Sequence, residues 1–199
     1  MTIPQRTIRA GGMILLLVLI TACGATAPRE GDGMSRYRSV LEATDPATIE
    51  TPAHGSLAEE RGLAAFRSLY EIFSAEAIRA YVPEVYETDA YFRDGFHEVE
   101  GVDAIETYFL KSIEPAVECT FDIQDITSHE GNYYMRWVMH LVLKSDPDRP
   151  IVTVGMTHAR FNAAGKIVFH QDYWDTGTVY ERIPILGSVI RMIKRRIVK

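Results

Sequence analysis

The chain has 199 residues, 27 acidic and 21 basic, with a formal net charge of −6. Hydrophobic residues make up 47% and charged residues 24%, which is ordinary for a globular domain and excludes a disordered or collagen-like chain. Two cysteines are too few for a disulfide-stapled mini-protein, and the acidic balance disfavours nucleic-acid binding. The length allows one domain of common size with short additions.

Residues 1–22 have the pattern of a bacterial signal peptide. Arg6 and Arg9 precede an apolar run over residues 11–20, which is too short for a transmembrane helix. Residues 20–23, Ile-Thr-Ala-Cys, resemble a lipobox, in which the cysteine (here Cys23) is lipidated and becomes the first mature residue. Ordinary cleavage nearby remains an alternative, and so does a start at Met34, which would leave the protein in the cytoplasm.

We therefore expect a lipid-anchored protein of the bacterial cell envelope. Gly24, where an aspartate would retain the protein at the inner membrane, favours the outer membrane, facing the periplasm. Residues 23–55 contain three prolines and no sustained apolar period, so we predict a flexible tether there. A short helix over residues 37–43 is an alternative within it.

Apolar residues at helical spacing predict three helices in the following segment. Ser56 and Glu59 are spaced as a capping box and begin the first helix. Ser74 caps the second, which we expect to end before Pro83. The third helix runs from Gly101 to Pro115.

Residues 85–96 predict a strand and a turn, and four further strands follow. They cover residues 117–127, 133–143, 151–161 and 166–176, with short turns between them that predict antiparallel hairpins. Residues 56–183 are therefore expected to form an α+β domain with the helices on one face of a curved sheet.

Four segments of this domain resemble the nuclear transport factor 2-like superfamily: residues 91–96, 101–109, 160–167 and 171–174. Its members include ketosteroid isomerases, SnoaL-like polyketide cyclases, limonene epoxide hydrolases and scytalone dehydratases. The resemblance covers residues 57–180. It implies a cone-shaped, mostly antiparallel sheet whose concave side and helices enclose a pocket, and a homodimer through the outer sheet face is common among members. The scaffold hosts enzymes and non-enzymes, so it predicts the fold better than the reaction.

Alternation along the last strand puts His170, Asp172 and Trp174 on one face. The resemblance to ketosteroid isomerase implies that this face lines the cone. A histidine beside a carboxylate is suited to act as a general base or proton relay. The alternative is a purely structural His–Asp pair.

Asp94 matches the position where the isomerases carry their proton-shuttling carboxylate, although Gly95 replaces the usual proline. Desolvation in an apolar pocket would raise the pKa of this carboxyl and suit it to acid–base work. The alternative is a turn residue that caps backbone amides. Thr157 falls where the isomerase has a hydrogen-bond-donating acid, and Tyr70 could replace its tyrosine donor. Threonine is a weaker donor, so steroid isomerisation is not expected.

Tyr91, Trp137, Thr157 and Trp174 are the predicted ligand-binding residues. The histidines at 97, 140, 158 and 170 lack the spacing of a compact metal site, and no cofactor motif is present, so we predict neither metal nor cofactor.

Residues 184–199 carry an apolar stripe and five basic side chains in the last nine residues, which leaves −11 on the other 190. This pattern predicts a basic amphipathic helix that lies on an anionic lipid surface. A helix packed over the cone mouth or against a dimer partner is the alternative.

Three functions follow from these observations. The first is a lipid-anchored domain that binds a small apolar molecule, with catalysis unproven. The second is an acid–base enzyme of the isomerase, cyclase or epoxide hydrolase type that uses Asp94, His170 and Asp172. The third is a non-catalytic interaction module that dimerises through the outer sheet face.

Overall fold

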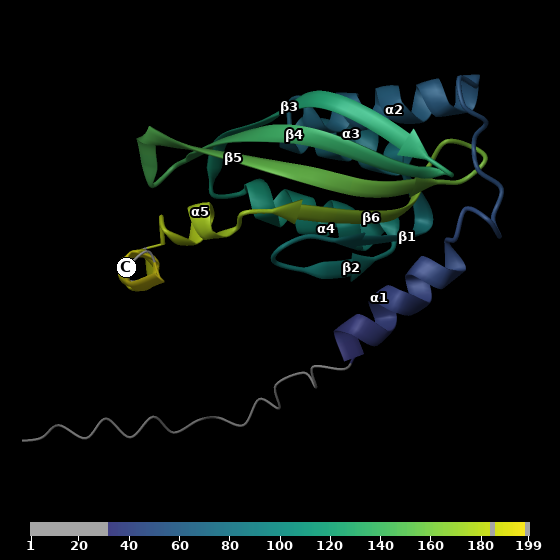
Figure 1. Cartoon of the computed structure of the whole chain (residues 1–199). Coiled ribbons are helices and arrows are strands. Elements are labelled where there is room, and N and C mark those ends of the chain that lie inside the picture. Colours follow the sequence, from purple (N-terminus) through teal and green to yellow (C-terminus); the bar gives the residue numbers. More distant parts are fainter. Residues whose placement is uncertain (1–31, 184–185, 198–199) are drawn as a thin grey trace, which may run out of the picture.

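The computed structural model describes residues 32–183 and 186–197. Along the chain these residues form α1 (Asp32–Ala43), α2 (Leu57–Tyr70), α3 (Ala75–Val85), β1 (Tyr86–Arg93), β2 (Glu98–Glu100), α4 (Val102–Ile113), β3 (Ala116–His129), β4 (Asn132–Leu143), β5 (Asp146–Phe161), β6 (Ile167–Trp174), α5 (Gly177–Tyr180) and α6 (Leu186–Ile197) (Figure 1).

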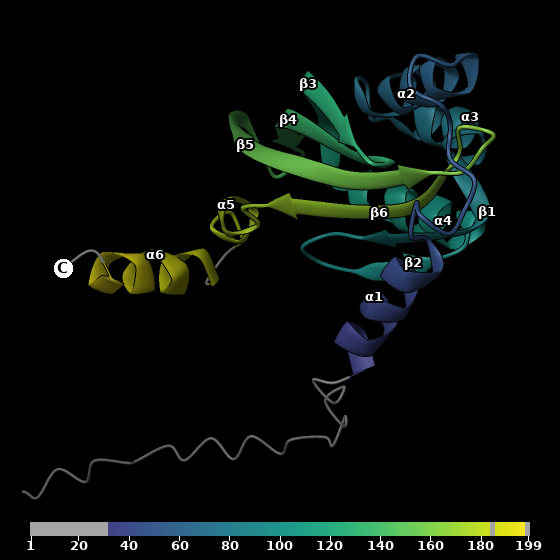
Figure 2. The same cartoon turned by 45° about the vertical axis from the view of Figure 1, so that its right-hand side comes forward.

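The strands form one six-stranded sheet in the order β2-β1-β6-β5-β4-β3. Neighbouring strands are antiparallel except for β1 and β6, which are parallel. Helices α2, α3 and α4 lie on one side of the sheet, which curves around them (Figures 1 and 2). The predicted α+β cone, with three helices on the concave side of a mostly antiparallel sheet and a further C-terminal helix, is confirmed.

Serine caps begin α2 and α3, as the sequence predicts. The Ser56 hydroxyl accepts the Glu59 N–H at 3.3 Å, and the Ser74 hydroxyl accepts the Ala77 N–H at 3.2 Å. The capping box at Ser56 is only half formed, because the Glu59 carboxylate accepts the Gly55 N–H instead of returning to Ser56.

The prediction that the second helix ends before Pro83 was wrong, since α3 continues to Val85. Proline removes one helical hydrogen bond. Pro83 lies in the last turn of α3, so the turns before it keep their hydrogen bonds. Val82 and Val85 are fully buried on either side of it, and the Tyr86 N–H still donates to the Val82 carbonyl. Tertiary packing therefore outweighs the local preference.

The core between the helices and the concave face is built largely from aromatic rings. Along β4, the alternate residues Tyr133, Met135, Trp137 and Met139 are all buried. The Trp137 indole lies directly against Gly155 of β5, where an added Cβ would come within 2.2 Å of the ring. A glycine at this position therefore makes room for the indole.

Residues 32–43 of the segment predicted as a flexible tether form α1, so the alternative of a short helix over residues 37–43 is confirmed and the helix is longer than expected. Val40 of this helix packs with Tyr91 and Phe169 on the outer side of the sheet. The Arg160 guanidinium donates to the Leu41 carbonyl at 2.6 Å. Helix α1 is therefore part of the fold, while the signal peptide, Cys23 and the remainder of the tether up to residue 31 lie outside the described residues.

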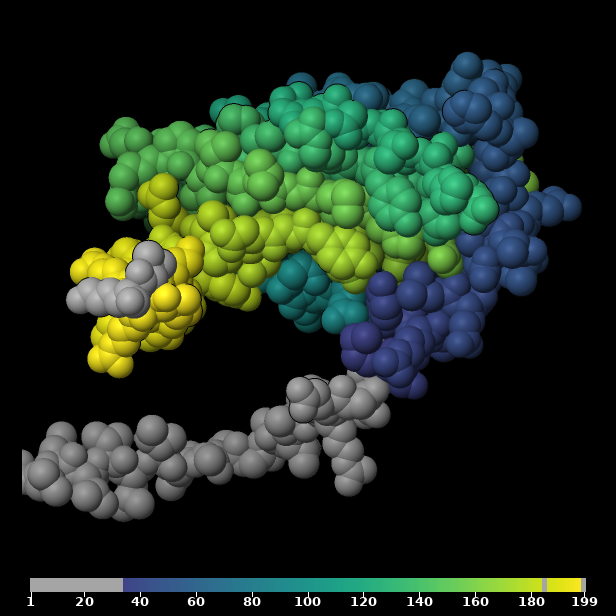
Figure 3. Space-filling model, viewed as in Figure 1, coloured from purple at the N-terminus to yellow at the C-terminus, as the bar shows by residue number. Residues whose placement is uncertain are grey.

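Helices α5 and α6 extend from the end of β6. Arg182 anchors this segment to the start of β5 through Asp146 at 3.1 Å. Helix α6 projects beyond the sheet, away from the helices on the concave side (Figures 2 and 3). Within residues 32–183 and 186–197, no helix combines the length and apolar character that crossing a bilayer requires.

Candidate functional site

A cavity of about 180 Å³ lies between the concave face of the sheet and helix α4. Nine of the 19 side chains that line it are aromatic, including Tyr70, Phe109, Trp137 and Trp174. Two carboxylates, Asp94 and Asp172, also line it, whereas its lining contains no lysine, arginine or histidine. Such a mostly apolar cavity with a few convergent polar groups is typical of a small-molecule site.

The last strand, β6, supplies one wall of the cavity. Asp172 and Trp174 line it, and His170 lies on the same face one step deeper, fully buried. The three side chains therefore point toward the interior, in the register that the sequence analysis predicted. Their roles in binding or catalysis remain predictions.

Hydrogen bonds join four side chains into a continuous chain beneath the cavity wall. The Tyr70 and Tyr86 hydroxyls lie 2.7 Å apart, and the Tyr86 hydroxyl lies 2.9 Å from Nδ1 of His170. Nε2 of His170 lies 2.9 Å from Oδ1 of Asp172. Both ends of this chain, Tyr70 and Asp172, line the cavity, whereas Tyr86 and His170 are buried behind it. The arrangement can carry a proton between two points of one cavity.

Thr157 and Trp137 extend this network on the other side of Asp172. The Trp137 indole N–H donates to the Thr157 hydroxyl at 3.0 Å, which in turn donates to Oδ1 of Asp172 at 2.5 Å. The hydroxyl of Thr157 is thus committed to Asp172 and does not line the cavity. Oδ1 of Asp172 accepts both protein hydrogen bonds, so its second oxygen, Oδ2, is the one available to a ligand.

Asp94 caps the turn, which is one of the two interpretations of the sequence, and its side chain also lines the cavity. One of its oxygens accepts the backbone N–H groups of Phe96 and His97 at 2.8 and 2.7 Å, which caps the turn between β1 and β2. The other accepts the Tyr108 hydroxyl at 2.6 Å. Burial raises the pKa of the Asp94 carboxyl, the hydrogen bonds oppose that rise, and the charge of Asp172 adds to it.

Burial also favours the neutral forms of two tyrosines and one cysteine in or behind the cavity wall. It raises the pKa of both the Tyr70 and the Tyr86 hydroxyls well above the usual value. It also raises the pKa of the Cys119 thiol to about 12, with help from the charge of Glu118. Cys119 is therefore an uncharged lining group and not a thiolate nucleophile.

Tyr91, one of the predicted ligand-binding residues, does not line this cavity. Alternation along β1 places the neighbouring Phe92 inside and turns Tyr91 to the outer side, where its ring stacks on Phe169 with centroids 5.6 Å apart. The prediction named Tyr91 as an aromatic residue of a matching segment, without an assignment of the two faces of β1. The resemblance identified the segment, but it did not set the register of this strand.

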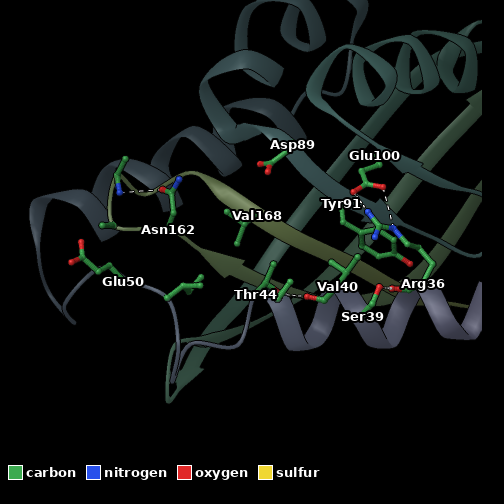
Figure 4. A pocket seen from close by; sticks show the side chains of 14 residues that line it. Arg36, Ser39, Val40, Thr44, Glu50, Asp89, Tyr91, Glu100, Asn162 and Val168 are labelled. Carbon is green, nitrogen blue, oxygen red and sulfur yellow. Dashed lines mark hydrogen bonds and ion pairs between the residues drawn. The ribbon is translucent and has the colours of Figure 1, made fainter.

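A second hollow, of about 680 Å³, lies on the outer side between α1 and the sheet, and Tyr91 contributes to it (Figure 4). Arg36 and Glu100 form an ion pair across it, and both side chains are about half exposed. Its other two carboxylates, Glu50 and Asp89, are exposed as well, so the charged groups of this hollow lie in solvent. We consider the smaller, aromatic cavity the candidate site because its polar groups are buried.

The remaining histidines do not join the site. His97 stacks on Tyr108 at 5.3 Å near the turn. His158 lies on the outer face, where Nε2 contacts the Asn132 side-chain oxygen at 2.9 Å. Over the described part of the chain, no three metal-ligating side chains are grouped closely enough to hold a metal ion.

Three residues of the site were missed by sequence reasoning. Tyr86 links Tyr70 to His170, Tyr108 donates to Asp94, and Phe96 lies edge-to-face with Trp174 at 5.1 Å. Tyr108 follows Ile105 by three residues in α4 and could have been placed on its inward side. Tyr86 had no sequence signal, because its partners are 16 and 84 residues away.

The structure defines a class of protein: an α+β cone that encloses a mostly apolar cavity lined by two carboxylates. The family model of the SnoaL-like domain matches residues 66–170, which is more than half of the chain. The chain therefore belongs to the SnoaL-like domain family. No curated protein matches it significantly.

Solved structures share the fold at low sequence identity. A protein from Jannaschia sp. CCS1, provisionally assigned as a SnoaL-like polyketide cyclase, is 12% identical with a TM-score of 0.55, covering 67% of this chain and 98% of that one. A provisionally assigned isomerase from Bacillus subtilis is 16% identical, also with a TM-score of 0.55, over 63% and 94%. A hypothetical protein with a ketosteroid isomerase-like fold from Catenulispora acidiphila DSM 44928, in complex with trimethylamine, is 15% identical with a TM-score of 0.52, covering 60% of this chain and 88% of that one.

Proposed function

We propose that this domain binds a small, mainly apolar molecule without negative charge in the cavity between the sheet and α4. The observation that carries the proposal is the lining, in which aromatic side chains surround two carboxylates and no basic side chain is present. An anionic ligand would meet like charge and find no counterion, whereas a neutral ligand can donate to Asp172 or Asp94. A cavity of about 180 Å³ suits a compact ligand, since an engineered cavity of ~150 Å³ holds benzene.

Tryptophan fluorescence tests this proposal directly. The chain has two tryptophans, Trp137 and Trp174, and both line the cavity. Titration with 2-naphthol should change their emission saturably, whereas 2-naphthoate, which has the same rings and a negative charge, should bind at least about tenfold more weakly, equivalent to ~1.4 kcal/mol. Equal binding of the two probes would contradict the proposed charge preference.

A blocking variant tests whether the probe enters this cavity. Ser112 lines the cavity, so Ser112→Phe should fill part of it and weaken 2-naphthol binding. Val152→Phe is the matched control, because Val152 is half exposed and is not part of the lining. If both variants bind as the wild type does, the cavity is not the binding site.

Acid–base catalysis is the second candidate function, and the hydrogen-bonded chain from Tyr70 to Asp172 favours it. Asp172 would take a proton from a bound molecule at Oδ2, and the Tyr70 hydroxyl would return one at a second position. Proton shifts through His170 and Tyr86 would then restore both groups, so that the net reaction is an isomerisation with no co-reactant. Asp94 is the less direct member of this candidate site, because burial raises its pKa but three protein hydrogen bonds hold its two oxygens.

Substitutions separate the binding proposal from the catalytic one. For any substrate that is turned over, His170→Ala and Asp172→Asn should each abolish turnover while 2-naphthol binding persists. His97→Ala is the control, since this residue lies outside the hydrogen-bonded chain. Full activity of both variants would reject the assigned roles.

We also propose that the domain is held at a bacterial membrane by a lipid on Cys23. The support is the sequence pattern of residues 1–23, which precede the described residues. Mass spectrometry of the detergent-extracted full chain should show an acylated N-terminal Cys23, and Cys23→Ala should release the protein into the soluble fraction. An unmodified mass for the wild type would contradict the anchor.

A further inference from the structure

Helix α6 presents an apolar face that the domain does not cover. Leu186, Val189, Ile193 and Ile197 recur at helical spacing, and between 41% and 77% of each side chain is exposed. In a globular protein such a face normally packs against the core. Here the helix projects past the end of the sheet instead (Figure 2).

The other side of α6 is strongly basic. Arg191, Lys194, Arg195 and Arg196 lie within residues 186–197, which include no aspartate or glutamate. An exposed apolar stripe flanked by basic side chains matches the chemistry of an anionic lipid surface, where the stripe enters the acyl boundary and the cations meet the phosphates. A partner protein would need a groove of matching shape, whereas a bilayer needs none.

The helix is held in a defined place relative to the domain. The Lys194 ammonium pairs with the Glu181 carboxylate, and the Arg191 guanidinium donates to the Glu181 carbonyl at 2.9 Å. Gly187 packs so closely on the Glu181 carbonyl that an added Cβ would lie 2.1 Å from it. These contacts use the polar side of α6 and leave the apolar stripe outward.

The cavity opens at this same end of the molecule. Its deep wall is formed by buried rings such as Phe109, whereas Phe96, Trp174 and Val179 are partly exposed. Val179 belongs to α5, which directly precedes α6, and the neighbouring Tyr180 ring contacts Phe96 at 5.4 Å. The mouth and α6 therefore lie at the same end of the molecule, joined through α5.

We propose that α6 docks on an anionic lipid surface and brings the cavity mouth next to the bilayer, so that the ligand is a molecule dissolved in the membrane. The docking stands independently of ligand binding, and the nature of the ligand rests on the proposed function. Eight residues lie between Cys23 and Asp32, and the nine steps from one to the other span at most about 30 Å. A lipid on Cys23 would hold α6 close to the surface and favour its docking.

The test uses the full chain in lipid nanodiscs with a fluorescent label on a single introduced cysteine. The buried Cys119 reacts poorly, and the wild type serves as the labelling blank. Labels at Val189→Cys and Ile193→Cys should be quenched by nitroxide-bearing lipid, whereas Ser188→Cys, on the polar side of α6, should not. Quenching should be stronger in phosphatidylcholine discs that contain phosphatidylglycerol than in phosphatidylcholine alone.

Charge variants and distant labels complete the test. Arg195→Gln with Arg196→Gln should shift the docking equilibrium toward solvent by up to about thirtyfold, at ~1 kcal/mol for each basic group. A label at Phe96→Cys, at the mouth, should be quenched weakly, and one at Glu130→Cys, in the hairpin at the opposite end of the sheet, should not be quenched (Figure 1).

Two results would overturn the proposal. Labels at residues 189 and 193 that stay fully exposed to water would show that α6 does not dock. Labels that are protected there without lipid quenching would show that a second copy or another protein covers the stripe. Failure of 2-naphthol binding would reject the proposed function and leave the docking result unaffected.

Discussion

Removal of the Tyr86 hydroxyl tests the hydrogen-bonded chain at its centre. Tyr86→Phe keeps the ring, which is 1% exposed, but deletes the group that joins Tyr70 to Nδ1 of His170. Two hydrogen bonds are lost, at ~1 kcal/mol each, and His170 keeps a buried nitrogen without its partner, at ~1–3 kcal/mol. The Tyr70 hydroxyl borders the cavity, so it can form a hydrogen bond with water in place of the one to Tyr86. We therefore expect a loss of about 3–5 kcal/mol in the free energy of unfolding.

Tyr70→Phe is the matched control, because it removes only the end of the chain. The Tyr86 hydroxyl keeps His170 as its partner, so the expected loss is about 1 kcal/mol. The double variant should cost little more than Tyr86→Phe alone, since the bond between the two hydroxyls can be lost only once. Urea unfolding followed by tryptophan fluorescence measures all three variants. A smaller loss for Tyr86→Phe than for Tyr70→Phe would refute the reasoning.

Three further predictions concern other parts of the fold. Burial and the charge of Arg160 lower the pKa of His158 from 6.5 to about 4, so its stabilising contribution is complete above pH 6.5 and is lost as the pH falls toward 4; urea unfolding should show the advantage of wild type over His158→Gln shrinking across that range. Gly155→Ala should lower the melting temperature and disturb Trp137 fluorescence, because the new Cβ would overlap the indole; unchanged values would contradict the observed packing. Val154 is 66% exposed on the outer sheet face, so Val154→Glu should convert the predicted homodimer to monomer in light scattering.

The fold was largely predictable because its signals are local. Serine caps, helical spacing, strand alternation and short turns each act within about fifteen residues, and together with the resemblance they indicated the cone correctly. The errors arose where distant packing decides the outcome. Pro83 lies inside α3 because two buried valines hold it there, and α1 forms because Phe169, more than 120 residues later, provides a surface for Val40.

The candidate site was predictable only in part, for a related reason. Period-two alternation located His170, Asp172 and Trp174 on one face, since all three belong to one strand. Tyr91 was proposed only as an aromatic residue of a matching segment, without an assignment of the two faces of β1, and it lies on the outer side of the sheet. The link through Tyr86 joins one helix and two strands, α2, β1 and β6, so all three must be placed before it can be seen.

The two carboxylates of the cavity are held in different ways, and this difference bears on the choice between binder and enzyme. Asp94 accepts three protein hydrogen bonds that fix both of its oxygens. Asp172 accepts two on one oxygen and presents the other to the cavity. A group that exchanges protons with a ligand needs an accessible oxygen and a neighbour with which it can exchange the proton afterwards. Asp172 has the accessible oxygen Oδ2, and His170 is the neighbour. Asp94 instead fixes the turn at the mouth. Asp94→Asn should therefore lower the free energy of unfolding more than Asp172→Asn does.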